Sequence, residues 1–452
     1  MHLSSGLWPF ATVGWPEAAG APATSDFKRF YPAHVMETGY DILFFWVARM
    51  VMMAYEFTDK APFHTIYMHG LVRDGEGQKM SKTKGNVIDP IDTIEKYGCD
   101  ALRYSLVTGC TPGQDVPLSM EKVEANRNFA NKLWNAGKYL QNALSKLSPE
   151  ERESLAVAGP MAAAELAALP LAERFIVSRC HELTHRVTEL LEAFNFGEAG
   201  RQIYEFIWDE FADWYIEISK TRSGDEGRAA RRTLVYVWDS CLRLLHPFMP
   251  FITEVLWQVA PHRGSSLMLA EWPLMATAAA LPVDAAAVAD FESIRSVVRS
   301  VRNARAEYNV EAGKKIAAVV RIASPHLRAQ LSSERAALCL LAKIDDAQLL
   351  IETPSASSTP PAGAVHLVVQ EGLEIFLPTS GMVDYAKEIV RLTRQAEKLQ
   401  KDVATLEARL ASPGYLDKAP EKLVAEVRAT IADKREQVAT IERSVGDMRE
   451  KL

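Results

Sequence analysis

The most regular hydrophobic pattern of the chain lies in its C-terminal part, residues 381–452. Apolar residues recur there at alternating steps of three and four, the spacing that places them along one side of a helix. The first run consists of Ile389, Leu392, Ala396, Leu399, Val403, Leu406 and Leu410. After Ser412-Pro413-Gly414 the pattern resumes at Val424, Val427, Ile431, Lys434, Val438, Ile441, Val445, Met448 and Leu452. We therefore expect an antiparallel coiled-coil hairpin, with a first arm of about 29 residues or about 43 Å at 1.5 Å per residue.

Helical spacing also dominates residues 119–282. Apolar side chains fall on one helix face at Phe129, Leu133 and Leu140, and again at Ile203, Phe206, Ile207, Phe211, Trp214 and Ile218. Several amphipathic helices in series predict a bundle. We expect four tryptophans to pack inside this bundle rather than to stack on nucleotide bases: Trp208, Trp214, Trp238 and Trp257.

Residues 283–380 mix the two periodicities and predict a small α+β domain. A helix is expected over Ile294–Tyr308. Short apolar runs typical of strands follow at Lys315–Ala323, Gln348–Glu352, Val365–Val369 and Leu373–Leu377. The Ser-, Thr- and Pro-rich stretch 354–363 is expected to be a loop.

Residues 1–118 combine short apolar runs with glycine and proline punctuation, which is typical of an α/β domain. We expect a strand and turn over Ala33–Gly39, then a helix over Asp41–Phe57 with Asp41 as its N-cap. A second strand is expected over Thr65–His69, followed by a polar, glycine-rich loop. The predicted fold class is therefore α/β plus all-α, in four parts.

Composition narrows the class of protein. With 452 residues, 48% hydrophobic and 24% charged, the chain has ample material for packed cores. Its five cysteines are odd in number and none are spaced C-x-x-C, which argues against a disulfide framework or a cysteine-rich zinc site and favours a cytoplasmic location. No apolar run approaches the ~20 residues of a membrane span. The net charge of −7 does not exclude a nucleic-acid partner, because a local basic surface is what meets phosphates.

The most specific chemical signal is the segment Lys79-Met80-Ser81-Lys82-Thr83, within the polar loop Asp74–Asn86. A glycine-containing loop after a strand, carrying several ammonium groups, is suited to bind polyphosphate and to stabilise charge on a leaving pyrophosphate. The alternative is a solvated basic loop without a ligand. The continuation Gly85-Asn-Val-Ile-Asp-Pro90 makes that alternative less attractive.

Residues 79–90 closely resemble the KMSKS signature of class I aminoacyl-tRNA synthetases, with Thr83 where serine is usual. A hydroxyl is kept, so little effect is expected. The wider resemblance is to the valyl-tRNA synthetase family and covers essentially the whole chain in order. It is carried by Ser4–Phe10, Gly14-Trp15-Pro16, Thr38–Met50, Tyr67–Val72, Thr111–Asp115, Asn128–Asn135 and the C-terminal coiled coil.

This resemblance implies roles for individual residues. Lys82 would contact ATP phosphates with the help of Lys79, within a signature that also includes Met80 and Ser81. His69 and Gly70 would border the adenine, and Gly39 and Asp41 would hold the adenylate ribose or the amino-acid ammonium group. An apolar pocket for the valine side chain would be lined by Trp8, Ile42 and Trp46. Core packing is the competing explanation for these three side chains.

The resemblance also implies the organisation and the partners. Residues 1–118 would be the second half of a Rossmann catalytic domain, 119–282 an anticodon-binding domain, and 381–452 an arm that binds tRNA. The expected ligands are valine, ATP with Mg²⁺ and tRNA(Val). No structural zinc is expected, and no binding to DNA or to a membrane. The protein is expected to be a monomer. From residue 383 onward there are 14 Lys and Arg against 13 Asp and Glu, so charge alone does not decide whether the arm grips RNA. Candidates for contact are Arg391, Arg394, Lys398 and Lys401, although a solvated face explains them equally well.

Three expected features of such an enzyme are absent from the sequence. Class I chemistry needs a His-x-Gly-His motif, which does not occur in the 452 residues, and the first Rossmann half and the editing domain are also missing. We therefore expect the isolated chain to be inactive, and residues 1–118 to expose a sheet edge and to be poorly stable. Two alternatives stay open: a non-catalytic fragment that binds tRNA, or a related isoleucyl- or leucyl-tRNA synthetase.

Overall fold

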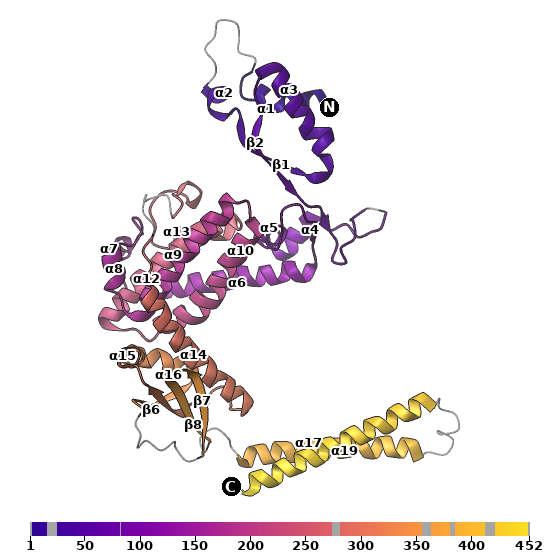
Figure 1. Cartoon of the computed structure of the whole chain (residues 1–452), viewed down its shortest axis with the longest axis vertical. Coiled ribbons are helices and arrows are strands. Elements are labelled where there is room, and N and C mark those ends of the chain that lie inside the picture. Colours follow the sequence, from indigo (N-terminus) through magenta and orange to yellow (C-terminus); the bar gives the residue numbers. More distant parts are fainter. Residues whose placement is uncertain are drawn as a thin grey trace. The chain divides into compact units, whose positions relative to one another are not determined.

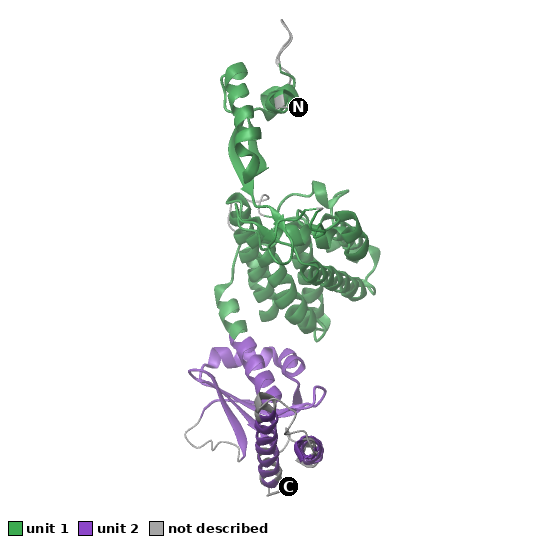
Figure 2. Ribbon diagram, turned by 90° about the vertical axis from the view of Figure 1, so that its right-hand side faces the viewer, with its two compact units in different colours: residues 1–292 green, residues 293–452 purple. Residues whose placement is uncertain are grey.

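The computed structural model describes residues 2–15, 25–81, 83–273, 281–354, 363–379, 385–411 and 421–450 (Figure 1). The chain divides into two compact units, residues 1–292 and 293–452 (Figure 2). The first unit holds a small α/β portion followed by many helices. The second holds a four-stranded sheet with its helices and a pair of long helices.

The α/β portion is built on two parallel strands, β1 (Ala33–Gly39) and β2 (Phe63–His69), as predicted for both segments. Their connection contains helix α3 (Ala48–Thr58), against which helix α1 (His2–Ala11) packs. Phe10 of α1 and Ala54 of α3 are fully buried in the small core between these helices. A short helix α2 (Ser25–Phe30) precedes β1.

The helix after β1 differs from the prediction. A 3₁₀ turn (Tyr40–Ile42) and a π-helical turn (Leu43–Val47) come first, and the α-helix begins only at Ala48. Asp41 lies inside the 3₁₀ turn, and the extended residue at the N-cap position is Gly39, which has no side chain to accept a bond. The N-cap role predicted for Asp41 is therefore wrong, because a capping side chain must come from the extended residue that precedes the helix.

The sheet edge expected to be exposed is confirmed. Among the described residues, β1 has only β2 as a strand neighbour. Large apolar side chains of this portion are exposed to solvent, among them Phe44 at 80% and Met52 at 71%. Parallel sheets are normally covered on both faces, so this portion carries apolar surface without a partner among the described residues.

A short parallel pair, β3 (Val72–Arg73) with β4 (Val116–Pro117), joins this portion to the helices. Helix α4 (Pro90–Tyr97) is capped by Asp89, whose Oδ1 accepts the Ile91 N–H at 2.7 Å. The remaining helices are α5 (Cys99–Val107), α6 (Met120–Leu144), α7 (Pro149–Ser154), α8 (Ala163–Ala167), α9 (Leu171–Glu192), α10 (Phe196–Glu205), the π-helical segment Phe206–Tyr215, α11 (Ile216–Ser219), α12 (Gly224–Leu245), α13 (Pro250–Val259) and the 3₁₀ turn Leu267–Leu269.

The predicted helical bundle and its aromatic core are confirmed. Trp214, Trp238 and Trp257 are buried. Trp208 is half-buried and stacks on Tyr204, with ring centroids 5.5 Å apart. The Lys132 ammonium lies over the Trp208 ring, 3.8 Å from its centroid. These rings are therefore occupied by protein neighbours.

Helix α14 (Ala285–Glu307) begins nine residues before the predicted start and leads into the second unit. The sheet has the order β6-β5-β8-β7, from β5 (Ile316–Ile322), β6 (Ile344–Glu352), β7 (Ala364–Gln370) and β8 (Leu373–Pro378). All four predicted strands are confirmed, although β6 starts at Ile344. Between β5 and β6 lie helices α15 (Pro325–Ser333) and α16 (Arg335–Ala342), which the sequence pattern did not single out. Most of the expected loop, residues 355–362, lies outside the described residues.

The predicted coiled-coil pair is confirmed as α17 (Tyr385–Ala411) and α19 (Glu421–Glu450). Gln400 of α17 donates a hydrogen bond to Glu442 of α19, and Arg435 of α19 donates one to Glu407 of α17. Residue numbers thus rise along one helix as they fall along the other, so the pair is antiparallel. Val403, Val427 and Ile431 are buried between the helices. The connecting Ser412-Pro413-Gly414 lies outside the described residues. Among the described helices of the chain, none is long and apolar enough to cross a membrane.

Candidate functional site

Part of the site predicted from sequence lies at the carboxyl ends of β1 and β2. Gly39 and His69 are the last residues of these strands and are directly paired in register. A Cβ added to Gly39 would lie 2.7 Å from Asp41 Oδ1 and 3.7 Å from His69 Cε1. The structure therefore brings Gly39, Asp41 and His69 together, and the missing side chain of Gly39 makes room for the carboxylate.

Both ring nitrogens of His69 face hydrogen-bond acceptors. Its Nε2 lies 3.0 Å from Glu37 Oε1, and its Nδ1 lies 2.8 Å from the Gly70 carbonyl oxygen. A neutral imidazole donates through only one nitrogen, whereas the imidazolium donates through both. Glu37 and the Gly70 carbonyl oxygen thus fix the orientation of the ring, and sequence reasoning did not assign this role to Glu37.

Asp115 ties three segments of the site together. Its Oδ1 accepts the Leu71 N–H at 2.8 Å and the Tyr40 hydroxyl at 3.4 Å, and its Oδ2 pairs with the Arg73 guanidinium. The Leu71 N–H first, and then Arg73, hold the pKa of this carboxyl below its usual range. The resemblance included Asp115 in its motif without a role, and no local pattern could reveal partners more than forty residues away.

Gly70 is required by the close approach of the same segment. A Cβ at this position would lie 1.8 Å from the Gln114 carbonyl oxygen, far inside contact distance. Only glycine lets the backbone of residues 69–71 reach the chain that carries Asp115. The position predicted to border the adenine is therefore also a packing point.

The loop with the ammonium groups follows β3. Lys79 is exposed, and Met80 and Ser81 are half-buried. The Ser81 hydroxyl lies 3.2 Å from that of Thr83, so threonine keeps a hydroxyl contact within the loop. Lys82, the second lysine of the predicted phosphate site, lies outside the described residues.

The three side chains predicted to line an apolar pocket lie on neighbouring elements. Trp8 comes from α1, Ile42 ends the 3₁₀ turn, and Trp46 belongs to the π-helical turn on which α1 packs. Trp8 is 65% exposed and Ile42 40% exposed, whereas Trp46 is half-buried. The valine pocket stays a prediction.

An apolar cavity of about 400 Å³ lies beside the Glu37–His69 pair. It is lined by Val35, Glu37, Tyr67, His69, Leu106, Val107, Cys110, Phe194 and Phe196. Burial raises the pKa of the Tyr67 hydroxyl and of the Cys110 thiol, so both groups are neutral. The cavity lies where the strand ends meet α5 and the start of α10.

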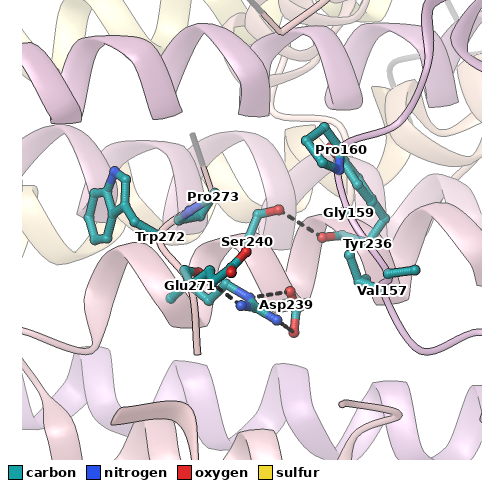
Figure 3. Close-up of a pocket in the computed structure, with 11 residues that line it drawn as sticks. Val157, Gly159, Pro160, Tyr236, Asp239, Ser240, Glu271, Trp272 and Pro273 are labelled. Carbon is teal, nitrogen blue, oxygen red and sulfur yellow. Dashed lines mark hydrogen bonds and ion pairs between the residues drawn. The ribbon is translucent and has the colours of Figure 1, made fainter. Parts of the chain in front are cut away.

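A smaller cavity of about 80 Å³ lies in the helical region (Figure 3). Two of its charged groups pair with each other: Asp239 Oδ2 accepts from Arg243 Nε at 2.6 Å, and Arg243 also donates to the backbone carbonyl oxygen of Glu271 at 2.9 Å. Asp239 Oδ1 additionally accepts the Trp257 indole N–H at 2.8 Å. These bonds satisfy the polar groups internally, which indicates a packing feature of the bundle.

Comparison with known families decides the identity. Residues 1–119 match a family described as tRNA synthetases class I (I, L, M and V), and residues 173–321 match the anticodon-binding domain of tRNA ligase. Residues 384–449 match the valyl tRNA synthetase tRNA binding arm. The chain belongs to the valyl-tRNA synthetase family. Its helical region is thus an anticodon-binding region, and the antiparallel pair α17 and α19 is the helical arm.

Relatives of the family extend well beyond this chain. The chain is 44% identical to the chloroplastic/mitochondrial valine–tRNA ligase 2 of Arabidopsis thaliana and covers 44% of it with 96% of its own length. It is 42% identical to the valine–tRNA ligase of Geobacillus stearothermophilus, covering 48% of it with 96% of its own length. The chain therefore spans about half the length of the valyl-tRNA synthetases it matches, and corresponds to their C-terminal portion.

Proposed function

We propose that this chain supplies the phosphate-binding loop and the tRNA-binding parts of a valine–tRNA ligase. Such an enzyme converts valine and ATP to valyl-adenylate and pyrophosphate, and then transfers the valyl group to tRNA(Val). The observation that carries the proposal is the match of the C-terminal helices to a valyl-specific arm, on the same chain as a lysine-rich loop at the strand ends.

In this proposal the loop provides positive charge where the reaction develops negative charge. Lys79 and Lys82, within the segment that also holds Met80 and Ser81, would bind the ATP phosphates and stabilise the leaving pyrophosphate. Mg²⁺ would enter with ATP as part of the substrate. The residue types do not demand a structural zinc, and none is proposed.

The strand ends would hold the rest of the adenylate. His69 and Gly70 would border the adenine, and Gly39 and Asp41 would hold the ribose or the ammonium group of valine. This assignment is supported by the closeness of Gly39, Asp41 and His69. Trp8, Ile42 and Trp46 would contact the valine side chain. Catalysis would then consist of positioning and charge stabilisation, without a covalent intermediate on the protein.

The chain by itself is proposed to be inactive in amino-acid activation, because its sequence has no His-x-Gly-His motif. Its function in isolation would be to bind tRNA as a monomer, through the bundle and the arm. A related isoleucyl or leucyl specificity is disfavoured by the valyl-specific arm. Cytoplasmic location belongs to the proposal as well, and the Arabidopsis relative, named chloroplastic/mitochondrial, shows that the family also serves organelles.

Binding of tRNA tests the proposal directly. We expect the full chain to bind tRNA(Val) in fluorescence anisotropy at 50 mM salt, and to bind markedly more weakly at 200 mM as phosphate contacts are screened. The variant Arg394→Gln/Lys398→Gln should weaken binding, since both side chains are exposed on α17. The matched control Glu397→Gln, on the same helix, should not weaken it.

Two outcomes would contradict parts of the proposal. Failure to bind tRNA at 50 mM salt would refute the tRNA-binding role of both the bundle and the arm. Valine-dependent exchange of pyrophosphate into ATP by the isolated chain would refute its proposed inactivity. Equal affinity for tRNA(Val) and tRNA(Ile) would refute a preference of this chain for tRNA(Val).

A further inference from the structure

The loop that carries Lys79 is held at its two ends by one pair of side chains. Asp74 follows β3 directly, and Asn86 precedes the cap of α4. Asn86 Nδ2 donates to Asp74 Oδ2 at 2.8 Å. The pair therefore closes a loop of which the tip is exposed, whereas Asp74 and Asn86 themselves are half-buried.

Each partner also fixes backbone on its own side of the loop. Asp74 Oδ1 accepts the N–H groups of Gln78 at 2.7 Å and Glu76 at 3.1 Å. Asn86 Oδ1 accepts the Ser81 N–H at 2.9 Å, and its Nδ2 also approaches the Lys79 carbonyl oxygen at 3.3 Å. One carboxylate and one amide thus hold the backbone on both sides of Lys79.

The chemistry of the pair is directional. The Asp74 carboxylate only accepts hydrogen bonds, whereas the Asn86 amide donates to it and accepts from Ser81. Two carboxylates or two amides at these positions therefore cannot form the same bonds. The bond from Asn86, followed by the Gln78 N–H, holds the pKa of Asp74 below its usual range. Lys84 also faces this carboxylate and further favours its charged form. The clamp is therefore complete at neutral pH.

We propose that Asp74 and Asn86 are positioning residues that fix the backbone of the phosphate-binding loop before ATP arrives. The phosphate part of this statement rests on the proposed function, whereas the clamp is a property of the loop itself. Holding Lys79 and its neighbours in place in advance lowers the ordering cost of binding a polyphosphate. Gly77 and Gly85, at φ +78° and +68°, let the backbone turn on either side of the held segment.

A charge swap tests the clamp in the full chain. Asn86→Asp puts two carboxylates in contact, and Asp74→Asn puts two amide donors in contact, so each single variant should break the link. The double variant Asp74→Asn/Asn86→Asp restores one donor and one acceptor and keeps acceptors for Gln78 and Ser81. Hydrogen exchange of the Gln78 and Ser81 amides should be faster by about tenfold in each single variant, and should return to near wild type in the double variant.

The control and the contradicting result are equally specific. Glu76→Gln removes a charge from the same loop without touching the Asp74–Asn86 bond, and should leave both amides as protected as in wild type. Single variants that exchange like wild type, or a double variant that exchanges like the singles, would overturn the clamp.

A second measurement separates the clamp from the ATP assignment. Trypsin cleavage after Lys79 is followed with Mg²⁺ and either ATP or inorganic tripolyphosphate. We expect protection in wild type and the double variant, at several-fold lower ligand concentration than in the single variants. Restored exchange in the double variant without protection by either ligand supports the clamp and refutes the phosphate role. Protection that is equal in all variants overturns the clamp as a positioning device.

Discussion

Replacement of Arg222 by methionine should strongly destabilise the anticodon-binding region. Its guanidinium donates through Nε and Nη2 to the two carboxylate oxygens of Glu173, each at 3.2 Å. The side chain of Glu173 is 0% exposed and that of Arg222 3% exposed, so the pair is buried between α9 and the connection from α11 to α12. Arg222→Met keeps most of the packing volume but removes the positive charge that Arg222 places against the carboxylate.

The magnitude follows from this burial. Removing one partner of a buried ion pair costs about 3–5 kcal/mol, because the other charge stays in a medium of low polarity. The Tyr215 hydroxyl, 3.5 Å from Glu173, is a neutral donor that remains in the variant, and burial raises its pKa so that it stays protonated. A neutral donor does not replace a bidentate cation, so the loss should stay within this range. It is a large fraction of the ~5–15 kcal/mol that stabilises a typical domain.

Urea denaturation followed by tryptophan fluorescence measures the loss, because Trp238 and Trp257 are buried in the same bundle. The matched control is Arg228→Met, which breaks an exposed pair with Asp225 and should cost less than about 1 kcal/mol. The double variant Glu173→Met/Arg222→Met should recover most of the stability, since no charge is left buried. If Arg222→Met unfolds at the same urea concentration as Arg228→Met, the reasoning on burial is refuted.

Three further results are expected. Gly70→Ala should displace the Gln114 carbonyl oxygen, which must retreat from 1.8 Å to beyond 3.4 Å, and the Leu71 amide should then exchange hydrogen faster. Burial lowers the pKa of His181 below 6.5, so on acidification the unfolded chain binds a proton before the folded chain does. The free energy of unfolding should therefore fall as pH drops below about 6.5, by up to about 1.4 kcal/mol per pH unit. His181→Gln should flatten this slope in urea titrations at pH 5 to 7. Asp100 of α5 accepts two N–H groups at the start of α13, so Asp100→Ala should lower the free energy of unfolding in urea by about 1 kcal/mol, and Asp100→Asn, which keeps one acceptor oxygen, should lower it less.

Much of the local structure could be predicted from the sequence. The strands at 33–39 and 65–69, the four strands of the second unit and the antiparallel helices of the arm all follow from periodicity. Such patterns are reliable where a segment buries one face, because burial then imposes the same spacing on the sequence. The lysine-rich loop was also visible, since its chemistry is written in consecutive residues.

The sequence failed where the outcome depended on backbone detail. Asp41 looked like a helix cap, but the turn after β1 places it two residues after the N-cap position, which Gly39 occupies. The helices α15 and α16 were missed because their short apolar runs carry little periodic signal. The sequence also did not reveal which apolar side chains would be exposed. Trp8, for example, is 65% exposed, although core packing was one of the explanations considered for it.

What the sequence by itself determined is therefore the main strands, the coiled-coil arm, the loop chemistry and the family resemblance. What only the tertiary structure decided is which distant residues meet: Glu37 with His69, Asp115 with Leu71 and Tyr40, and Asp74 with Asn86 across the loop. The physical reason is that hydrogen bonds are short and directional, so their partners are fixed by strand register and loop closure rather than by spacing along the chain.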